Sequence, residues 1–556
     1  MDYVADFETT IEEDKSRVWA WAYSQIGNVT NWDYDNNIQS FIYLCRKGKE
    51  NKNVYFHNLK FDGFFLIDYL LKNGFRYSET KEDNTFNTII SKEGAFYQIE
   101  VVFKKLTKKY KKVTFLDSLK KLPFTVKQIA KAFGLPIEKG DLDYKLERPE
   151  GWVITEDEKK YIKNDVQIVA MALGIQFEQG LTKMTIGSDA LSSFKDVIGK
   201  QMFNYNFPLI DNETHEDIKR AYRGGFTYVS ERYQGKDVKE GLVFDVNSLY
   251  PSVMYDSELP FGEPEFFQGK YEYDENYPLY IQKFKCTFEL KKDKIPTIQI
   301  KNDIRFKGTE YLKKYDGMPV TLYLTNVDLE LFYDHYDVED EVWLSGYKFQ
   351  SCVGIFRDYI DYWMKIKETT TGAVRLLAKL MLNSLYGKFS TNIDVTGKYP
   401  VLEDGIVKLK DKEQEFRKPV YMPMGVFITS WARHKTITTA QSVYERFIYA
   451  DTDSIHLEGA EIPDNIDIHP TKQGLWCHEG TFTRARFVRP KTYIEEIEGK
   501  LHVTCSGMPD NVKEHVTWDN FHEGLVLHGK LAPKKVKGGI VLVEGPFSLN
   551  RRVRFG

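Results

Sequence analysis

The sequence has few cysteines and no long apolar run. Its five cysteines are scattered, odd in number and without any pair at zinc-ligand spacing, which argues against a disulfide framework and against a structural zinc site. No uninterrupted apolar run approaches the roughly 18 residues that a membrane helix needs. The first residues, Met-Asp-Tyr-Val-Ala-Asp, lack the basic start of a signal peptide. Together these absences predict an intracellular protein with free thiols and no membrane segment.

The chain also lacks a strong excess of charge of either sign. Its formal net charge of −4 argues weakly against a protein coated in nucleic acid. Local basic runs are nevertheless present, although such a run is more often a solvated face than a phosphate contact. They lie at 104–112, 484–491 and 530–537, and at Arg551, Arg552 and Arg554. Aromatic residues make up 15% of the chain and suit stacking on unpaired bases where basic groups lie among them, although core packing accounts for most of them.

A chain of 556 residues predicts roughly three or four structural units, and no internal repeat or low-complexity tract divides it. Strand-like runs at 3–7, 18–23 and 114–116 and a helical pattern at about 157–176 predict an α/β domain that ends near Gly187. A second α/β body is expected to start at residue 245 and to resume near 424, after a segment with short strand signals at 260–356 and a charged β segment at 391–419. Residues 365–389 predict a helical hairpin that is split at 369–372, and the part after 506 predicts a β-rich cap.

Two carboxylate motifs far apart in the chain carry the strongest chemical signal. They are Asp-Val-Asn-Ser-Leu-Tyr at 245–250 and Tyr-Ala-Asp-Thr-Asp-Ser at 449–454, each after an apolar lead-in with a β-branched residue. Both motifs are expected on strands, so that Asp245 and Asp453 converge across adjacent strands and hold two divalent cations. Two Mg²⁺ ions about 3.5–4 Å apart suit in-line phosphoryl transfer. The pair of motifs therefore favours nucleotidyl transfer.

A separate acidic set lies in the first predicted domain. Asp6 and Glu8 are two residues apart on a predicted strand, Asp62 follows, and Tyr161 and Asp165 stand at i and i+4 on one helix face. Any one of these acids is more often a surface carboxylate or a helix cap. Four acids brought together repel one another unless cations neutralise them, so the set predicts two metals, with Tyr161 orienting the attacking water. Their joint occurrence favours a metal-dependent nuclease separate from the site of Asp245.

The helix expected before residue 390 carries a polar stripe beside leucines. Arg375, Lys379, Asn383 and Tyr386 follow one another at spacings of four, four and three. Such a stripe is usually a solvated face. Facing a cleft, Lys379 would instead act as a point charge on a triphosphate, and Tyr386 would stack on the nascent base pair.

The turn after the first motif adds a second aromatic candidate. Pro251 is expected to end the strand and turn the chain into a helix. Tyr250 at that turn would lie beneath the sugar of an incoming nucleotide and clash with a 2′-hydroxyl. The alternative for Tyr250 is a core tyrosine with a satisfied hydroxyl.

The same residues resemble the protein-primed family B DNA polymerases of small tailed bacteriophages with linear genomes. Nine motifs in the order of that family carry the resemblance and span nearly the whole chain. They are Asp-Phe-Glu-Thr-Thr at 6–10, residues 58–62, 161–165, Tyr-Arg-Gly-Gly at 222–225, the motif at 245, residues 379–387, Thr-Ser-Trp-Ala-Arg at 429–433, the motif at 449 and Lys-Thr-Tyr at 491–493.

The resemblance implies an α/β (α+β) right-hand polymerase with an amino-terminal, ribonuclease-H-like 3′–5′ exonuclease domain and two insertions. The implied parts are exonuclease 1–186, first palm part 187–256, insertion for the terminal protein 257–356, fingers 357–390, insertion for strand displacement and processivity 391–422, second palm part 423–505 and thumb 506–556.

Residue roles follow from the same likeness. The polymerase metals would be held by Asp245, the Val246 carbonyl and Asp453, with Asp451 assisting, and the nucleotide by Tyr250, Lys367, Lys379, Asn383 and Tyr386. The exonuclease metals and catalysis would use Asp6, Glu8, Asp62, Asp165, Tyr161, Lys139 and Asp141. The ligands of single-stranded DNA would be Thr9, Tyr55, His57, Asn58, Phe61, Phe65, Ser118, Leu119 and Tyr144. The primer-template would meet Tyr222, Gly224, Gly225, Ser248, Leu249, Thr429, Arg433, Lys491 and Tyr493.

The implied partners are primer-template and single-stranded DNA, deoxynucleoside triphosphates and a terminal protein whose side-chain hydroxyl replaces a primer. Two Mg²⁺ ions are implied in each active site, with Mn²⁺ as a substitute, and the cytoplasm of the phage host as the location. The stretch after Tyr493 is shorter than the family pattern and the basic tail at 551–556 is unfamiliar, which leaves processivity and thumb contacts open. Two other classes remain on the residues alone: a stand-alone nuclease that uses only the first acidic set, and a metal-free single-strand binding protein. Nucleotide incorporation separates the polymerase from both.

Overall fold

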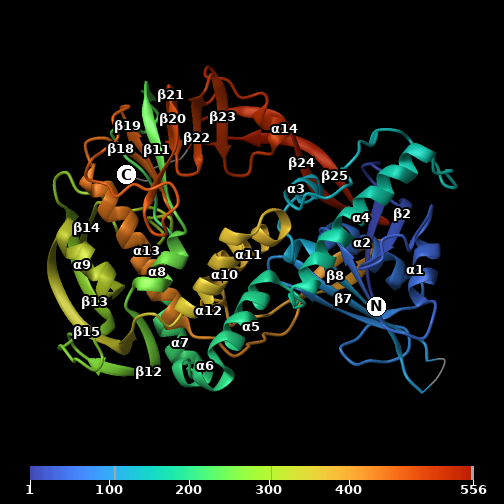
Figure 1. Ribbon diagram of the computed structural model, residues 1–556, viewed down its shortest axis with the longest axis horizontal. Coiled ribbons are helices and arrows are strands. Elements are labelled where there is room, and N and C mark those ends of the chain that lie inside the picture. Colours follow the sequence, from blue (N-terminus) through green and yellow to red (C-terminus); the bar gives the residue numbers. More distant parts are fainter. Residues whose placement is uncertain (106–107, 302, 552–556) are drawn as a thin grey trace.

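The structure, a computed structural model, describes residues 1–105, 108–301 and 303–551. Figure 1 shows an amino-terminal body on one side, a second body of green to orange elements opposite, and helices between them. The basic residues Arg552 and Arg554 lie outside the described part of the chain. Among the described residues, no helix combines the length and apolar character needed to cross a membrane.

The amino-terminal body is built on an eight-stranded sheet with the order β3-β2-β1-β4-β8-β7-β6-β5. β1 pairs parallel with β4, and β4 pairs parallel with β8, so the centre of the sheet is parallel. The strands are β1 (Asp2–Thr9), β2 (Val18–Gln25), β3 (Trp32–Asp35), β4 (Lys52–Phe56), β5 (Arg76–Tyr77), β6 (Thr85–Ile90), β7 (Phe96–Phe103) and β8 (Lys111–Asp117). All three strands predicted for this domain are confirmed.

Helices cover this sheet and connect it to the rest. They are α1 (Ile38–Arg46), α2 (Leu59–Lys72), the short 3₁₀ helix η1 (Ser118–Lys120), α3 (Val126–Ala132) and α4 (Glu156–Glu178). The predicted helix at 157–176 is α4, whose start is fixed by a capping box between Thr155 and Glu158. α4 packs on β1 and β2, and this brings Tyr161 and Asp165 to the strand that carries Asp6 and Glu8.

The second body contains a five-stranded antiparallel sheet with the order β20-β11-β19-β18-β9. Its strands are β9 (Thr227–Val229), β11 (Gly241–Val246), β18 (Phe447–Asp451), β19 (Ser454–Glu458) and β20 (Trp476–Phe482). The long helix α13 (Met422–Ser442) and α8 (Leu249–Asp256) pack together beside this sheet, and α13 also contacts β18 and β19. This five-stranded sheet therefore collects strands from both motif regions, as the sequence predicts. We call it the palm sheet, after the part that the resemblance implies here.

A four-stranded sheet with the order β10-β21-β22-β23 stands next to the palm sheet. Its strands are β10 (Asp237–Val238), β21 (Arg484–Arg489), β22 (Thr492–Ile497) and β23 (Lys500–Cys505). A shared apolar core, which includes Tyr449 of the palm sheet and Phe487 of the second sheet, fills the space between the two. We call this four-stranded element the adjoining sheet.

Residues 257–356, which we call the insertion after the part that the resemblance implies, contain a separate antiparallel sheet with the order β12-β15-β13-β14. Its elements are β12 (Leu259–Gln268), β13 (Leu279–Leu290), β14 (Lys314–Thr325), α9 (Asn326–His335) and β15 (Tyr336–Cys352). The prediction of short strands is wrong here, because β-bulges in all three pairings bend the strands without ending them.

Helices α10 (Arg357–Thr369), α11 (Gly372–Ser384) and α12 (Tyr386–Phe389) form the predicted hairpin, which starts earlier than residue 365. They pack on α5 (Ile186–Ile198), which leads through α6 (Lys200–Asn206) to α7 (Asn212–Lys219). A fully buried ion pair between Lys121 and Asp189 fastens α5 to the amino-terminal body. The hairpin helices thus lie between the two bodies (Figure 1).

Two β-hairpins complete the chain. The predicted charged β segment is the hairpin of β16 (Lys398–Glu403) and β17 (Ile406–Asp411), and it packs on α2 and β6 of the amino-terminal body. The predicted β-rich cap contains α14 (Asp510–Lys513) and the long hairpin of β24 (Val526–Val536) and β25 (Gly539–Ser548). At its tip the Lys537 carbonyl accepts the backbone N–H of Ser16 at 2.9 Å. The carboxyl-terminal hairpin therefore reaches back to the amino-terminal body (Figure 1).

Candidate active sites

The first acidic set meets at the edge of β1. One carboxylate oxygen from each of Asp6, Glu8 and Asp165 lies within 4.8 Å of the other two, a spacing at which one cation can bind all three. Lys139 lies beside them, with its Nζ 3.1 Å from Asp165 Oδ2 and 3.2 Å from the Tyr161 hydroxyl. The prediction that β1 and α4 bring these acids together is confirmed.

Burial and mutual repulsion disturb the ionisation of this set. Burial, followed by the charge of Asp165, raises the pKa of Asp6 to about 7. Burial and the charge of Asp6 raise the pKa of Glu8 and of Asp62 well above their ordinary values. Among the described residues, Asp62 Oδ1 and Asp165 Oδ1 are buried without a hydrogen-bond partner. These oxygens have the character of ligands for a cation.

A cavity of about 220 Å³ opens over this cluster, and His57, Tyr144 and Tyr161 are among the residues that line it. His57 Nδ1 lies 2.9 Å from the Ser118 hydroxyl, and Tyr144 is 54% exposed at the rim. The predicted ligands Thr9, Phe61 and Leu119 are half-buried and Asn58 is exposed, whereas Tyr55, Phe65 and Ser118 are buried. Asp141 is exposed and is not one of the three clustered acids.

The second acidic set lies at one end of the palm sheet. Asp245 on β11 is paired with Ser454 on β19, and Val246 donates its backbone N–H to the Asp453 carbonyl at 2.8 Å. Burial, followed by the charges of Asp453 and Glu479, raises the pKa of Asp245 to about 6. Burial also raises the pKa of Asp453. Strand pairing therefore brings the two distant motifs together.

Two details of the strand prediction are wrong. Asp453 does not lie on a strand but in the turn between β18 and β19, because the chain reverses there and Thr452 adopts a φ of 55°. The strand that carries Asp245 ends at Val246, before Pro251, and Ser248 makes the turn into α8 with a φ of 53°. Pro251 lies in the first turn of α8, where its missing N–H costs no helical hydrogen bond.

Two further acids, Asp451 and Glu479, lie near this site and make different interactions. Asp451 ends β18 and forms an ion pair with Lys491, Nζ to Oδ2 at 2.9 Å. Glu479 lies on β20 and was not among the predicted site residues. Its charge raises the pKa of both Asp245 and Asp453. No motif marks Glu479. Its position follows from the pairing of β20 with β11, which only the fold reveals.

Two tyrosines from distant segments stack next to the second acidic set. The rings of Tyr250 and Tyr386 lie with their centroids 4.0 Å apart and their planes at 9°. Arg375, Lys379 and Asn383 form the exposed polar stripe of α11, while Leu377 and Met381 are buried on its other side. The predicted amphipathic helix is therefore confirmed, whereas the stack of the two tyrosines on each other is a contact that only the fold reveals.

Cations gather at the same helical hairpin. Arg375 donates from Nη1 to the Lys367 carbonyl at 2.6 Å. Burial, followed by the charges of Lys379 and Arg375, lowers the pKa of Lys367. Three cations on two helices suit a polyanionic ligand such as a triphosphate.

The chain is similar to known proteins in both sequence and fold. A family model described as DNA polymerase type B, organellar and viral, matches residues 44–148 and 141–469. The chain belongs to this polymerase family. It is 50% identical to the DNA polymerase of Bacillus phage Nf, over 98% of this chain and 99% of that protein. It is 49% identical to that of Bacillus phage phi29, over 98% of both chains, and 34% identical to that of Streptococcus phage Cp-1, also over 98% of both chains.

Solved structures of phi29 DNA polymerase have the same fold as this chain. The chain is similar to phi29 DNA polymerase complexed with primer-template DNA and incoming nucleotide substrates, with a TM-score of 0.95 and 49% identity over 99% of this chain and 100% of that chain. It is similar to phi29 DNA polymerase complexed with single-stranded DNA, with a TM-score of 0.94 and 48% identity over the same shares. This type B polymerase therefore has the predicted polymerase fold of mixed helices and strands.

In this polymerase the Tyr-Arg-Gly-Gly segment packs directly against the Asp451–Asp453 turn. Thr452 donates its backbone N–H to the Phe226 carbonyl at 2.7 Å. A Cβ at Gly225 would overlap the Thr452 side chain, whereas a Cβ at Gly224 would meet open space. Only Gly225 is therefore required to be glycine for this contact.

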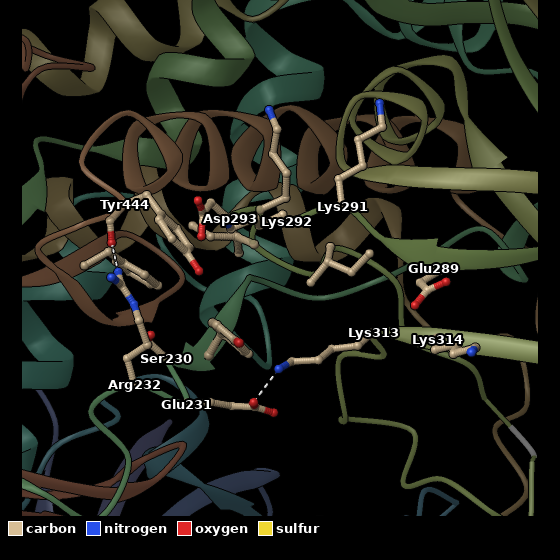
Figure 2. A pocket seen from close by; sticks show the side chains of 15 residues that line it. Ser230, Glu231, Arg232, Glu289, Lys291, Lys292, Asp293, Lys313, Lys314 and Tyr444 are labelled. Carbon is tan, nitrogen blue, oxygen red and sulfur yellow. Dashed lines mark hydrogen bonds and ion pairs between the residues drawn. The ribbon is translucent and has the colours of Figure 1, made fainter.

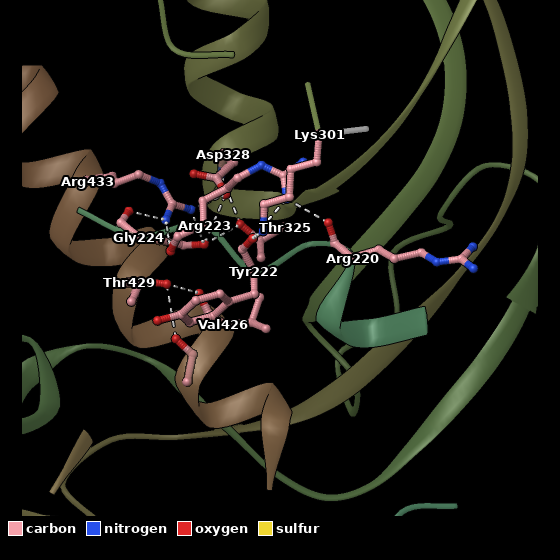
Figure 3. Close-up of polar contacts among 12 residues, drawn as sticks. Arg220, Tyr222, Arg223, Gly224, Lys301, Thr325, Asp328, Val426, Thr429 and Arg433 are labelled. Atoms are coloured by element: carbon pink, nitrogen blue, oxygen red, sulfur yellow. Dashed lines mark hydrogen bonds and ion pairs between the residues drawn. The ribbon is translucent and has the colours of Figure 1, made fainter. Parts of the chain in front are cut away.

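Arg433 and Thr429 of α13 lie inside the polymerase. Arg433, 4% exposed, donates from Nη1 to the carbonyls of Arg223 and Gly224 and from Nη2 to Asp328 of the insertion, as Figure 3 shows. Thr429, 1% exposed, donates its hydroxyl within its own helix. A role of these two side chains at the primer-template stays a prediction, and in this fold it would act through the segment that Arg433 holds.

A larger cavity, of about 320 Å³, lies away from both acidic sets, between β9 of the palm sheet and the insertion (Figure 2). Three of its cations already have acidic partners: Lys313 pairs with Glu231, Arg232 with Glu445 and Lys294 with Asp334. Three aromatic rings, of Tyr228, Tyr444 and Phe447, also line it. This cavity contains no acidic cluster and is not a candidate for the chemistry of the polymerase.

Proposed function

We propose that this DNA polymerase replicates a linear phage genome by protein-primed, processive, strand-displacing synthesis and proofreads with a 3′–5′ exonuclease. The observation that carries the proposal is the presence of two separate acidic sites in one chain, one at the end of the palm sheet and one at the edge of β1. A DNA polymerase needs only one metal site to extend a primer, so the second site supports a second reaction. The three relatives named above are DNA polymerases of phages, which supports action in the cytoplasm of a host cell.

At the synthesis site, the negative charge of Asp453 acts on Asp245, and the pKa values of both carboxyl groups are raised. This arrangement fits two Mg²⁺ ions, held by the two carboxylates and the Val246 carbonyl, with Mn²⁺ as a substitute. The chemistry that such ions would supply when bound is activation of the primer 3′-oxygen and neutralisation of charge on the leaving pyrophosphate. Asp451 assists by fixing Lys491, its ion-pair partner, at the primer side.

The chain itself selects and orients the nucleotide. The stacked rings of Tyr250 and Tyr386 form a flat, rigid floor for the sugar and the nascent base pair. Lys367, Lys379 and Asn383 grip the triphosphate from the helical hairpin. Tyr222, Gly224, Gly225, Ser248 and Leu249 line the path of the primer-template next to the turn at Asp453, where Lys491 and Tyr493 also contribute.

At the proofreading site, Asp6, Glu8, Asp62 and Asp165 would hold two further metal ions, with the exposed Asp141 as a further carboxylate of the set. The buried, unpartnered oxygens of Asp62 and Asp165 support this assignment, because a buried carboxylate oxygen without a donor is stabilised by a cation. Tyr161 orients the attacking water, and Lys139, beside Asp165, offsets negative charge on the scissile phosphate. Thr9, Tyr55, His57, Asn58, Phe61, Phe65, Ser118, Leu119 and Tyr144 hold the frayed primer end.

The insertions account for priming and strand displacement. The sheet at 257–356 offers a surface beside the palm for the terminal protein, whose hydroxyl takes the place of a primer. The hairpin at 391–422 packs on the exonuclease body and the carboxyl-terminal hairpin of 506–556 reaches the same body. Template strand enclosed by such contacts cannot leave readily, which supports processive, strand-displacing synthesis. The remaining parts divide as exonuclease 1–186, palm 187–256 and 423–505, and fingers 357–390.

A gel assay on a 5′-labelled primed hairpin tests both activities at once. With Mg²⁺ and nucleotides the primer should lengthen, and with Mg²⁺ alone it should shorten. Shortening in Mg²⁺ alone that persists in a variant with Asp6→Ala and Glu8→Ala would contradict the proofreading assignment. Protein priming is tested separately with radiolabelled nucleotide and the cognate terminal protein, and failure to form a covalent protein–nucleotide adduct would remove that part of the proposal.

A further inference from the structure

We propose that His456 and Glu495 form a buried clamp that positions the primer-binding strand against the catalytic carboxylates. His456 Nδ1 lies 3.1 Å from Glu495 Oε1, and both side chains are only 4% exposed. The inference rests on the proposed roles of Asp245 and Asp453 in synthesis and of Lys491 and Tyr493 at the primer. His456 and Glu495 are positioning residues, because neither reaches the reacting atoms.

The clamp joins two sheets with different tasks. His456 belongs to β19 of the palm sheet, three residues after Asp453. Glu495 belongs to β22 of the adjoining sheet, two residues after Tyr493. One buried imidazole–carboxylate contact thus connects the strand next to the catalytic acids with the strand that carries the Lys-Thr-Tyr motif.

Strand register puts the clamp on the working face of the palm sheet. His456 is paired with Val243 on β11 and with Tyr449 on β18. Two positions along these strands stand Asp245 and Asp451, and residues two apart on a strand face the same side. His456 therefore lies on the face that also carries the two acids. In agreement with this placement, the charge of His456 lowers the pKa of Asp245, against the larger upward effect of burial.

An aromatic cage holds the imidazole. The rings of Tyr449, Phe487 and Tyr493 each have their centroid 5.3 Å from that of His456. Tyr493 stacks on Phe487 at 5.0 Å, so the cage fixes the ring of Tyr493 together with the imidazole. The Tyr449 hydroxyl accepts the backbone N–H of Lys491 at 3.0 Å. Both primer-side residues are thereby tied to the clamp and its cage.

The chemistry of the pair explains why apolar packing alone is not enough. Apolar side chains between two sheets can slide with little loss of contact, whereas a buried imidazole–carboxylate contact is favourable in one geometry only. Within the described residues, His456 Nδ1 and Glu495 Oε2 are both buried without a hydrogen-bond partner, and the 3.1 Å approach of His456 Nδ1 to Glu495 Oε1 is the polar contact that joins the two side chains. Loss of either partner would leave a polar group exposed to an apolar core and let β22 shift. The distance between the primer terminus and Asp245 would then change.

Four variants test the clamp: His456→Phe, Glu495→Leu, their combination, and Glu495→Gln, which keeps an oxygen acceptor for His456. Glu496→Gln is the matched control, because Glu496 is the next residue on the opposite face of β22 and bonds the Thr483 hydroxyl. For each protein we would measure fluorescence anisotropy of a primer-template in EDTA, kcat and nucleotide KM for extension, digestion of single-stranded DNA, and Tm. All assays run well below the lowest Tm.

His456→Phe and Glu495→Leu should each lower primer-template affinity and extension kcat by about tenfold, the scale seen for residues that orient a catalytic group. The nucleotide KM and the digestion of single-stranded DNA should stay within about twofold, because the tyrosine stack and the first acidic set lie elsewhere. The combined variant should lose no more than either single one, and Glu495→Gln should retain most activity.

Three results would overturn the clamp. The first is that the single variants bind and extend the primer-template as the unmodified protein does. The second is an equal loss of binding and extension in Glu496→Gln, and the third is a loss of digestion of single-stranded DNA that accompanies a fall in Tm. The last result would reduce the pair to general stability. The proposed function fails in a different way, namely if the unmodified protein does not extend the primer or if Asp453→Ala still does.

Discussion

Val246 donates its backbone N–H to the Asp453 carbonyl at 2.8 Å, and this single bond joins two motifs that lie about two hundred residues apart in the chain. The bond holds the β18–β19 turn against the end of β11, so the Asp453 carboxylate stays beside that of Asp245. A site built in this way tolerates little change in either motif.

Replacement of Asp245 or Asp453 by Asn should lower the rate of primer extension by at least roughly 10³-fold, the scale of removing a catalytic group. Asn keeps the shape but removes the charge that a divalent ion requires. The measurement is single-turnover extension with Mg²⁺, and digestion of single-stranded DNA by the same preparations serves as the folding control. Appreciable synthesis by Asp453→Asn would contradict the assignment.

The variant with Asp6→Asn and Glu8→Gln should lose digestion of single-stranded DNA and keep primer extension. The substitutions leave Asp165 without the two acids whose oxygens lie within 4.8 Å of its own. Degradation of a labelled oligonucleotide and extension of a primed template are followed in parallel. If digestion survives at the original rate, the exonuclease acids lie elsewhere.

The metal-free polymerase should become more stable as the pH falls from about 8 to about 5. The folded pKa of Asp6, about 7, and of Asp245, about 6, both lie above the ordinary value of 3.8. An acid whose pKa is raised in the folded state binds its proton more tightly there than in the unfolded chain. Its ionisation therefore lowers the free energy of unfolding above the folded pKa. Acidification protonates the group and restores that stability.

Thermal unfolding in EDTA across this pH range measures the effect, with an expected rise in Tm of a few degrees. A variant with Asp6→Asn and Asp245→Asn is the control, because other acids titrate in both proteins. The variant should show a smaller rise, and saturating Mg²⁺ should reverse the trend in the unmodified protein. Identical profiles of Tm against pH for the two proteins in EDTA would show that the pKa values of these two carboxyl groups are not raised by folding.

Gly225→Ala should reduce primer extension strongly, whereas Gly224→Ala should leave it nearly unchanged. The new methyl group at 225 overlaps the Thr452 side chain, and an overlap of this kind typically costs about 1–3 kcal/mol or displaces the neighbour. Displacement of Thr452 moves the turn that carries Asp453. Extension rates and Tm are compared for both variants, and adding Thr452→Gly to Gly225→Ala should restore part of the activity. Equal behaviour of the two alanine variants would argue against this contact.

Tyr250→Ala should weaken discrimination against ribonucleotides, while Tyr250→Phe should preserve it. The ring stacked on Tyr386 at 4.0 Å provides the barrier to a 2′-hydroxyl, and the hydroxyl of Tyr250 does not. The ratio of kcat/KM for a deoxynucleotide and its ribonucleotide counterpart measures discrimination. A phenylalanine variant that incorporates ribonucleotides as readily as the alanine variant would assign selectivity to the hydroxyl instead.

Short-range patterns predicted much of this polymerase. Alternation on β1 indicated that Asp6 and Glu8 face one side, and helical spacing indicated the same for Tyr161 and Asp165. The sequence also predicted the helical hairpin and its split, because helix-breaking residues are few in this segment except at 369–372. These features depend on residues close in sequence, whose geometry is set by backbone periodicity.

Other features depend on long-range pairing and were not predicted. Glu479 comes to the synthesis site because β20 pairs with β11. The burial of Arg433 on Asp328 and two backbone carbonyls follows from the packing of α13 against the insertion, while its role at the primer-template stays a prediction. The strands of the insertion looked short because bulges interrupt their alternation.

By itself the sequence determined which acids, lysines and tyrosines are candidates for the chemistry, since their spacings limit what each segment can do. Only the tertiary structure decided which of them meet. The bond from Val246 to Asp453, the stack of Tyr250 on Tyr386 and the contact of His456 with Glu495 each join segments whose separation along the chain carries no geometric information. Strand pairing and burial between sheets supply that geometry, because they bring distant segments into fixed register.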